Sequence, residues 1–407
     1  MLDVRESAEP GYGWVMVAVT FVLTGLAFGG MASVGVFLKP LAAEFGWSRG
    51  DISAGYTVVA LSSAVAGIGW GLLSDRIGAR RPAVIGVLAM AVALLLLSRQ
   101  TSLWQFYVFC FVYGAFGHGA ASVPLYANVG YWFTRNKGLA MGAMAAGGAM
   151  GQGVVPFVAR LLISEFDWQT AYMVLAAGYL AIGLPVTALV RDPPARLAGM
   201  AGIDVDANQA GVPLAPREVI AWISVAVIFC CTCMSVPIVH VVSLVSDRGF
   251  GPEQAASVLL VLMVAGTFGR LLGGKLADTV GALQAYMMMS LGQTLLVGWF
   301  PFIHGLSGTY VLAAAFGIAY SGVMAGVLIC LRVMVPVRLA GRAMGIGGFF
   351  GWFGMGFGSY QGGLVYDLTG TYTWSFGAAV FAGMINLAIL TAFYLRIQRR
   401  RAMAVAE

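Results

Sequence analysis

Long uninterrupted apolar runs dominate this sequence and decide what it can fold into. Twelve of them approach or exceed the roughly 20 residues that an α-helix needs to cross a hydrocarbon core of about 30 Å. In lipid, backbone polar groups must be satisfied within the segment, so each run is expected to be a helix. The predicted spans are 12–38, 51–73, 82–98, 103–131, 138–162, 170–190, 217–246, 252–277, 281–303, 308–334, 341–366 and 372–395. The predicted fold class is an all-α polytopic membrane protein with twelve transmembrane helices.

Composition supports this class and excludes others. Only 10% of the 407 residues are charged, against roughly 25% in a soluble domain. The five cysteines fall within apolar runs and lack the spacing and His partners of a zinc site, so neither a metal nor another cofactor is expected. The basic residues behind the net charge of +6 are scattered between the runs and form no stripe, which argues against a nucleic-acid partner.

The distribution of Lys and Arg predicts the orientation of the chain in the lipid bilayer. With both termini cytoplasmic, sixteen of the 23 basic residues lie on the inner side, as the positive-inside rule requires. The five predicted to lie outside are Lys39, Arg49, Arg99, Arg160 and Arg248. We therefore expect a multi-pass protein of the cell membrane with both termini in the cytoplasm.

One long polar interruption divides the chain into two halves. Residues 191–216 contain four prolines and several polar residues, and they cannot insert as a span. The predicted organisation is an N-terminal six-helix bundle over 1–190, a cytoplasmic linker over 191–216 and a C-terminal six-helix bundle over 217–407.

A repeat relates these halves. GLLSDRIG from Gly71 and GKLADTVG from Gly274 carry Gly, Asp and Gly at the same spacing, 203 residues apart. The tripeptide Ala140-Met141-Gly142 recurs at the same offset as Ala343-Met344-Gly345. Parallel repeats are typical of transporters whose substrate path lies between two halves.

These motifs carry a family resemblance. GLLSDRIGARRP resembles the signature loop of the major facilitator superfamily, and GKLADTVG is similar to its degenerate second copy. EPGYGW at 9–14 and YWFTRNKGLAMGAMAAGGAMG at 131–151 resemble the starts of the first and fifth helices in the monocarboxylate transporter and oxalate/formate antiporter branch. The resemblance implies the major facilitator fold and a cytoplasmic gating motif formed by Gly71, Asp75, Arg76, Gly78, Arg80 and Asp278.

Arg270 is the principal substrate-binding candidate. It lies within the eighth span, whereas all seventeen acidic residues lie in termini, loops or the last turns of helices. A charge at the bilayer centre costs at least about 2.5 kcal/mol, and a guanidinium can bind a carboxylate through two parallel hydrogen bonds. The family resemblance also implies a substrate-binding Arg at this place. The alternative is that Arg270 extends to the cytoplasmic interface.

Aromatic side chains are expected to complete the cavity. Phe349 and Trp352 recur at helical spacing in the eleventh span, Tyr320 lies in the middle of the tenth, and Tyr126 lies in the fourth. A pocket for a small organic acid combines apolar walls with a few polar groups, although packing against lipid or other helices is an equally open interpretation. Tyr320 and Phe349 rank first because the resemblance places cavity residues near them.

His118 is the candidate proton carrier. It lies in the middle of the fourth span between two glycines, and His is the side chain that ordinarily titrates near neutral pH. A hydrogen-bonded structural His is the alternative. Animal members of the branch carry an Asp one turn before the eighth-helix Arg, where this chain has Gly266, so coupling through that Asp is not expected here.

Together these features predict a transporter and not an enzyme. The expected function is secondary active transport of a small monocarboxylate, of the lactate or pyruvate type, as a proton symport by alternating access in a monomer. A single deep positive charge favours one carboxylate. An anion exchanger of the oxalate/formate type, or a carrier of another small organic acid, remains the alternative. The chain has no GxxxxGK[ST] motif, so ATP is not expected to drive transport.

Overall fold

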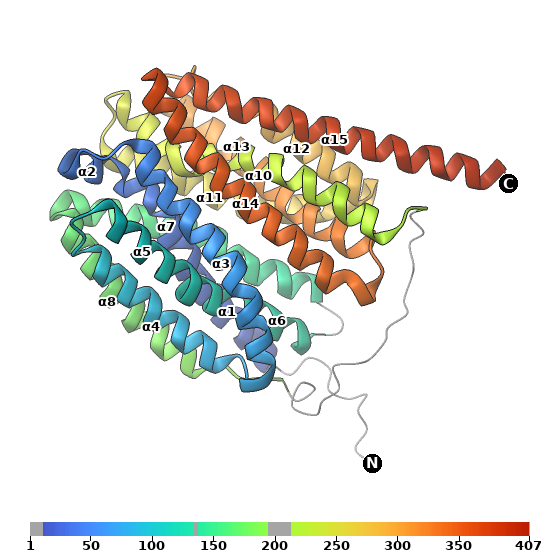
Figure 1. Ribbon diagram of the computed structural model, residues 1–407, viewed down its shortest axis with the longest axis horizontal. Helices are drawn as coiled ribbons and strands as arrows, with labels where there is room; N and C mark the ends of the chain where they lie inside the picture. Colours follow the sequence, from blue (N-terminus) through green and yellow to red (C-terminus); the bar gives the residue numbers. More distant parts are fainter. Residues whose placement is uncertain (1–10, 134–136, 194–212, 407) are drawn as a thin grey trace, which may run out of the picture. The chain divides into compact units, whose positions relative to one another are not determined.

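The apolar runs form helices in the computed structural model, which describes residues 11–133, 137–193 and 213–406 and contains no strand within them. The helices, coloured in chain order in Figure 1, are α1 (Tyr12–Ala32), α2 (Val34–Phe45), α3 (Arg49–Ile77), α4 (Arg80–Leu97), α5 (Leu103–Val112), the π-helix η1 (Tyr113–His118), α6 (Gly119–Trp132), α7 (Lys137–Glu165), α8 (Trp168–Ala188), α10 (Pro216–Asp247), α11 (Pro252–Val280), α12 (Ala282–Val297), α13 (Leu306–Val333), α14 (Val337–Thr369) and α15 (Tyr372–Ala406).

The predicted fold class is confirmed. Each predicted span corresponds to one helix or to consecutive helices, because α1 and α2 share the first span and α5, η1 and α6 share the fourth. Among the described residues, ten segments are long and apolar enough to cross a membrane. All-α architecture therefore follows from the hydrophobic pattern, and the interruptions within spans are local.

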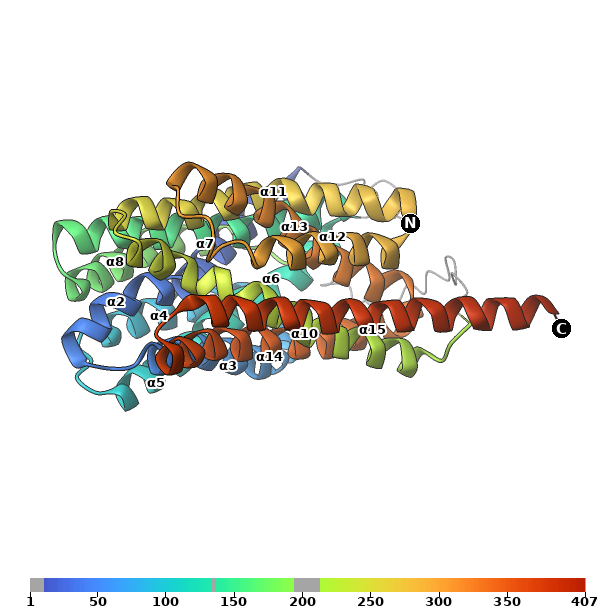
Figure 2. The same cartoon turned by 90° about the horizontal axis from the view of Figure 1, so that it is seen from above.

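Several predicted ends differ from the structure. The first span was expected to end at 38, but α2 continues to Phe45. The ninth span was expected over 281–303, but α12 ends at Val297 and turns follow it. The last was expected to end at 395, yet α15 continues to Ala406 and extends beyond the other helices of its half (Figure 2). The basic run Arg396–Arg401 is therefore helical, and Arg396 forms an ion pair with Glu218 at the start of α10.

The chain forms two compact units. Unit 1 comprises Met1–Phe45 and Leu61–Ile203, and unit 2 comprises Gly46–Ala60 and Asp204–Glu407. The segment Gly46–Ala60, which includes the start of α3, thus belongs with the C-terminal helices although it lies in the N-terminal half of the sequence. The remainder of α3 packs in unit 1.

The 203-residue repeat extends to the backbone. Arg49 and Ile77 bound α3, and Pro252 and Val280, each 203 positions later, bound α11, so both helices have 29 residues. Each is followed by a glycine with positive φ, +81° at Gly78 and +97° at Gly281.

Helix pairing also repeats between the units. In unit 1, Gly147 and Gly151 of α7 lie against the backbone carbonyls of Phe21 and Gly25 in α1. In unit 2, Gly354 and Gly358 of α14 lie against the carbonyls of Ile228 and Thr232 in α10. Small residues allow this close approach, which is a principal source of helix association in lipid.

Two helices, α5 and α8, are capped at their N-termini by a polar side chain. The carboxylate of Asp167 accepts a hydrogen bond of 2.5 Å from the backbone N–H of Thr170 and so caps α8. This bond is the main reason that the pKa of the exposed Asp167 is held below its usual value. At α5 the cap is weaker, because the Oγ of Ser102 lies 3.4 Å from the backbone N of Gln105.

Candidate functional site

Arg270 lies where α11 packs closely on α13. Gly269 and Gly273 of α11 lie against the backbone of Ile318 and Gly322 in α13. The Arg270 side chain is half-buried beside this seam, and its Nε atom is shielded from solvent. Because these glycines have no side chain, the backbones of the two helices can approach closely. Arg270, next to Gly269 in the sequence, adds a positive charge beside this contact.

Tyr320 of α13 is buried against the same helix. Its hydroxyl lies 3.3 Å from the Sδ of Met263, and its ring stacks on Phe316 with centroids 6.0 Å apart. Met263 and Arg270 are seven residues apart, so they lie on one face of α11 about 10 Å from each other. The structure therefore brings Tyr320 to the helix face that carries Arg270.

The other aromatic candidates lie on different elements. Phe349 and Trp352 lie one turn apart on α14 of unit 2; Phe349 is exposed over 36% of its surface, and Trp352 is half-buried. Phe349 makes an edge-to-face contact with Phe350 at 5.5 Å. Tyr126 is half-buried on α6 of unit 1. The sequence did not single out Tyr56, which is buried in unit 2.

His118 is held inside unit 1 by two neighbours. It is the last residue of η1, the π-helical turn between α5 and α6, and such turns occur frequently at functional positions. Its Nδ1 lies 2.6 Å from the Oγ of Ser63 in α3, and Phe28 of α1 contacts its ring edge-to-face at 4.5 Å. The π-turn thus directs His118 between α1 and α3. The pattern of apolar residues carried no sign of Ser63 as a partner.

The residues predicted to form a gating motif span the end of α3, a tight turn and the start of α4, with Asp278 on α11. Gly71 lies in the last turns of α3, Arg76 and Arg80 are exposed on either side of the turn, and Asp278 is exposed near the end of α11. Asp75 lies on α3, and its side chain lies outside the described residues.

An acidic residue that the sequence analysis did not identify fixes this turn. Asp192 accepts hydrogen bonds from the backbone N–H of Ala79 at 3.1 Å and from Nδ2 of Asn128 at 2.9 Å. A side chain at Gly78 would collide with the same carboxylate. Asp192 lies just after α8, so it ties the end of the first six spans to the signature loop.

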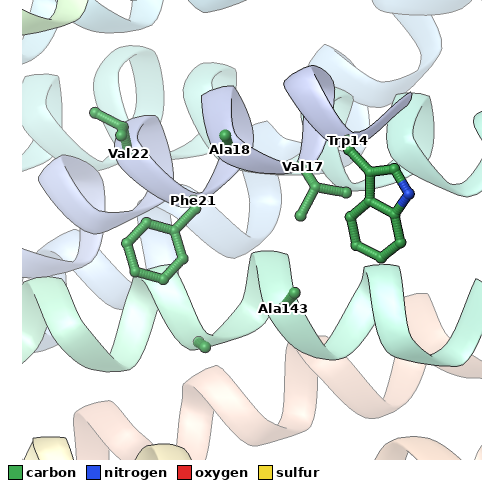
Figure 3. Close-up of a pocket in the computed structure, with 7 residues that line it drawn as sticks. Trp14, Val17, Ala18, Phe21, Val22 and Ala143 are labelled. Carbon is green, nitrogen blue, oxygen red and sulfur yellow. The ribbon is translucent and has the colours of Figure 1, made fainter. Parts of the chain in front are cut away.

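An apolar groove lies elsewhere in unit 1, between α1 and α7. Figure 3 shows Trp14, Val17 and Phe21 on the side of α1 that faces α7, with Ala143 opposite. The groove has a volume of about 500 Å³ and is lined by apolar side chains only. A carboxylate needs hydrogen-bond donors or a positive charge, so this groove does not suit an organic anion. Over the described part of the chain, no three His, Cys, Asp or Glu side chains lie together as metal ligands would.

Comparisons with known proteins bear on the fold and the family of the chain as a whole. The Major Facilitator Superfamily model matches residues 20–359 and, in a second match, 221–406. Monocarboxylate transporter 13 of Rattus norvegicus is 26% identical over 411 residues, which cover 97% of this chain and 92% of that protein. Monocarboxylate transporter 11 of Homo sapiens is 26% identical over 404 residues, which cover 92% of this chain and 82% of that protein.

A solved structure supports the fold. The crystal structure of a bacterial homologue of the human lysosomal transporter Spinster, in an inward-facing and unoccupied conformation, matches with a TM-score of 0.69. The match covers 96% of this chain and 97% of that chain at 15% identity. At this identity the likeness concerns the fold alone.

Proposed function

The chain belongs to the Major Facilitator Superfamily of membrane transporters, and we propose that it carries a small monocarboxylate, of the lactate or pyruvate type, together with a proton. Relatives named as monocarboxylate transporters match nearly the whole chain, which supports this substrate class. Transport is expected to proceed by alternating access between the two halves of the repeat. The chain is expected to act as a monomer in the cell membrane with both termini in the cytoplasm.

The observation that carries the proposal is the position of Arg270. A guanidinium half-buried within a membrane-spanning helix is costly, and charged residues retained in such positions commonly mark the pathway of a substrate or ion. Its planar fork matches the two oxygens of a carboxylate. We therefore assign Arg270 the role of binding the carboxylate of the transported acid.

Tyr320 is the second residue of this proposed site. Within the described part of the chain, its hydroxyl donates to the thioether sulfur of Met263, and sulfur is a weak acceptor. The hydroxyl can therefore turn to a keto or hydroxyl oxygen of the substrate at little cost. Phe349, Trp352 and Tyr126 are proposed as further walls of the path.

His118 is proposed to carry the coupled proton. Nδ1 and the Ser63 hydroxyl share one hydrogen bond, so a proton on Nδ1 would require the hydroxyl to turn and accept. Serine does this by a simple rotation, because it both donates and accepts. The pair can thus hold His118 in either protonation state.

The gating motif is proposed to close the cytoplasmic end. Arg76 and Arg80 are exposed beside the fixed turn at Gly78, so their charges are available to acidic partners in one conformation and to water in another. No lasting ion pair is required for this role, since exposed pairs contribute only about 0–1 kcal/mol.

The test is uptake of labelled L-lactate into proteoliposomes. We expect uptake that follows an imposed inward proton gradient and falls when an ionophore collapses it. Uptake that ignores the gradient but increases with an internal anion would replace symport with exchange of the oxalate/formate type. Absence of uptake for lactate, pyruvate and other small acids would refute the proposed substrate class.

A further inference from the structure

The π-turn η1 changes the hydrogen bonding of its own backbone. In an α-helix, the carbonyl of Ala115 would accept the N–H of Gly119, four residues later. That N–H bonds instead to the carbonyl of Gly114, five residues back. The ordinary partner of the Ala115 carbonyl is therefore taken. Ala115 is buried, and a buried carbonyl without a donor is costly where water cannot replace the donor.

Trp70 of α3 supplies a donor for this carbonyl. Its indole Nε1 lies 2.8 Å from the carbonyl oxygen of Ala115 and donates to it. An indole N–H can only donate, and it usually finds an acceptor when the side chain is buried. The indole also contacts Phe116 edge-to-face, with ring centroids 6.5 Å apart. A side chain of α3 thus bonds directly to the backbone of the π-turn.

Trp70 reaches the π-turn from the same face of α3 as Ser63. Residues 63, 67 and 70 are spaced at i, i+4 and i+7, which places them on one face of a helix. The Oγ of Ser63 lies 2.6 Å from Nδ1 of His118. A side chain at Gly119 would lie 3.3 Å from the backbone nitrogen of Gly67, so the two helices approach closely there. One face of α3 therefore contacts η1 and the residue that follows it at three successive points.

Helix α4 packs closely on the same turn. A Cβ added at Gly117 would lie 2.5 Å from the Cγ of Met90, and one added at Gly86 would lie 3.0 Å from the carbonyl oxygen of Gly117. These contacts leave little room for η1 to move toward α4. The direction of the His118 ring therefore depends on how the helix that carries it is wound.

The winding of η1 decides where His118 points. A π-turn holds one residue more than the α-helical turn that it replaces, and each residue of an α-helix turns the chain by about 100°. If the segment returned to an α-helix, the residues before and after it would rotate relative to each other by about that angle. His118 is the last residue of η1, so its ring would then leave the Oγ of Ser63.

We propose that Trp70 is a positioning residue for His118. Its indole stabilises the π-turn by donating to the Ala115 carbonyl, and the π-turn holds the imidazole against the Ser63 hydroxyl. Trp70 acts through the backbone, since its bond is to the turn and not to the imidazole. The inference rests on the proposed function, because the position of His118 matters to transport only if His118 carries the proton.

The test is nitrogen NMR of isotope-labelled histidine rings in lipid bilayers, comparing the parent protein with Trp70→Phe. Phenylalanine keeps an aromatic ring and removes the N–H. The chain has three histidines, so His118→Gln identifies the signals of His118. We expect Trp70→Phe to displace these signals, because Nδ1 would lose its partner Ser63. The signals of His240 and His304 should stay in place.

Transport gives a second measurement in the same variant. Leaving a buried carbonyl without a donor changes an equilibrium by roughly fivefold to a hundredfold. Uptake driven by a proton gradient should therefore fall by about fivefold or more in Trp70→Phe. Exchange of labelled for unlabelled substrate should be spared, as we expect for His118→Ala. A general loss of folded protein would instead lower both rates together.

Trp104→Phe is the matched control. Trp104 lies on α5 and is exposed over 74% of its surface, so the same exchange should leave the His118 signals and both transport rates unchanged. If Trp70→Phe does not fold, benzothienylalanine at position 70 repeats the test. This residue keeps the shape of tryptophan and carries a sulfur atom in place of the N–H.

Two results would overturn the positioning role. One is that the His118 signals keep their parental positions in Trp70→Phe, and the other is that Trp104→Phe displaces them equally. The NMR measurement needs no substrate. Unaltered uptake by His118→Ala would therefore refute the proposed proton carrier, whereas displaced His118 signals in Trp70→Phe would still support the role of Trp70 in placing the ring.

Discussion

Gly78 and Gly281 are equivalent residues 203 positions apart, and both have a left-handed backbone, with φ of +81° and +97°. Each ends a 29-residue helix. Residues with a Cβ lose roughly 1–3 kcal/mol in backbone conformations that favour glycine in this way. Both halves therefore place a glycine directly after this helix, although two residues separate α3 from α4 and one residue separates α11 from α12.

Replacing these glycines by alanine should lower the melting temperature by unequal amounts. A methyl group at Gly78 would collide with the Asp192 carboxylate, whereas at Gly281 it would meet the flexible end of Gln284. Because the collision adds to the backbone strain, Gly78→Ala should cost more than the roughly 1–3 kcal/mol expected at Gly281. Thermal unfolding in detergent measures the difference. Gly142→Ala, at a helical position with open space around it, is the control and should be nearly neutral.

Arg270→Lys should reduce kcat/KM for uptake by about thirtyfold or more while leaving the melting temperature close to that of the parent. Lysine keeps the charge but loses the fork, and a hydrogen bond to a charged group is worth about 1.5–3 kcal/mol. Lys275→Arg, an opposite exchange at an exposed position on the same helix, is the control. Parental uptake by Arg270→Lys would remove the arginine from the binding site.

His118→Ala should weaken uptake driven by a proton gradient and spare exchange of labelled for unlabelled substrate. Exchange returns the loaded carrier without net proton movement, so it does not need the proton carrier to be emptied. The measurement compares both rates in the same proteoliposomes, with His304→Ala in an exposed loop as the control. Equal loss of both rates would mean that His118 binds substrate or supports packing.

Asp167 should make the stability of the α7–α8 connection depend on pH in acid. Hydrogen bonds from Thr170 lower the pKa of Asp167 in the folded protein, so its contribution is present above the unfolded pKa of about 3.9 and is lost as the pH falls through the lower folded value. Asp167→Asn removes this titration and keeps a capping oxygen. The difference in melting temperature between the parent protein and Asp167→Asn should therefore be present at pH 7 and should shrink as the pH falls well below 4. A difference that is the same at both pH values would contradict the assignment.

Much of the fold could be predicted because length and hydropathy decide it. The runs at 51–73 and 252–277 became α3 and α11, and their shared motif correctly indicated the repeat. The π-turn at Tyr113–His118 could not be predicted, because changing the hydrogen-bond pattern of six residues leaves their hydropathy unaltered. The break between α1 and α2, after Ala32, likewise leaves no mark in the composition of the sequence.

The residues of the candidate site could be nominated from the sequence only one by one, and their roles stay predictions. A charge inside a span identifies Arg270 from sequence alone, but Ser63 beside His118 and Asp192 beside Gly78 are ordinary polar residues whose roles arise from packing. One signal was available for the contacts at the start of α3. Arg49 and Arg248 run against the positive-inside rule, and both are bound to specific acceptors in the structure.

The attachment of the start of α3 to α14 also imposes an order of events on synthesis. Arg49 and Asp367, which its backbone N–H contacts, are separated by 318 residues. At roughly 5–20 residues per second, the ribosome needs on the order of 15–60 s to make that interval. During this time the start of α3 is already in the membrane without the helix it will lie on. Unit 2 therefore cannot be completed until the eleventh span has been inserted, and its earliest component is among the last to be docked.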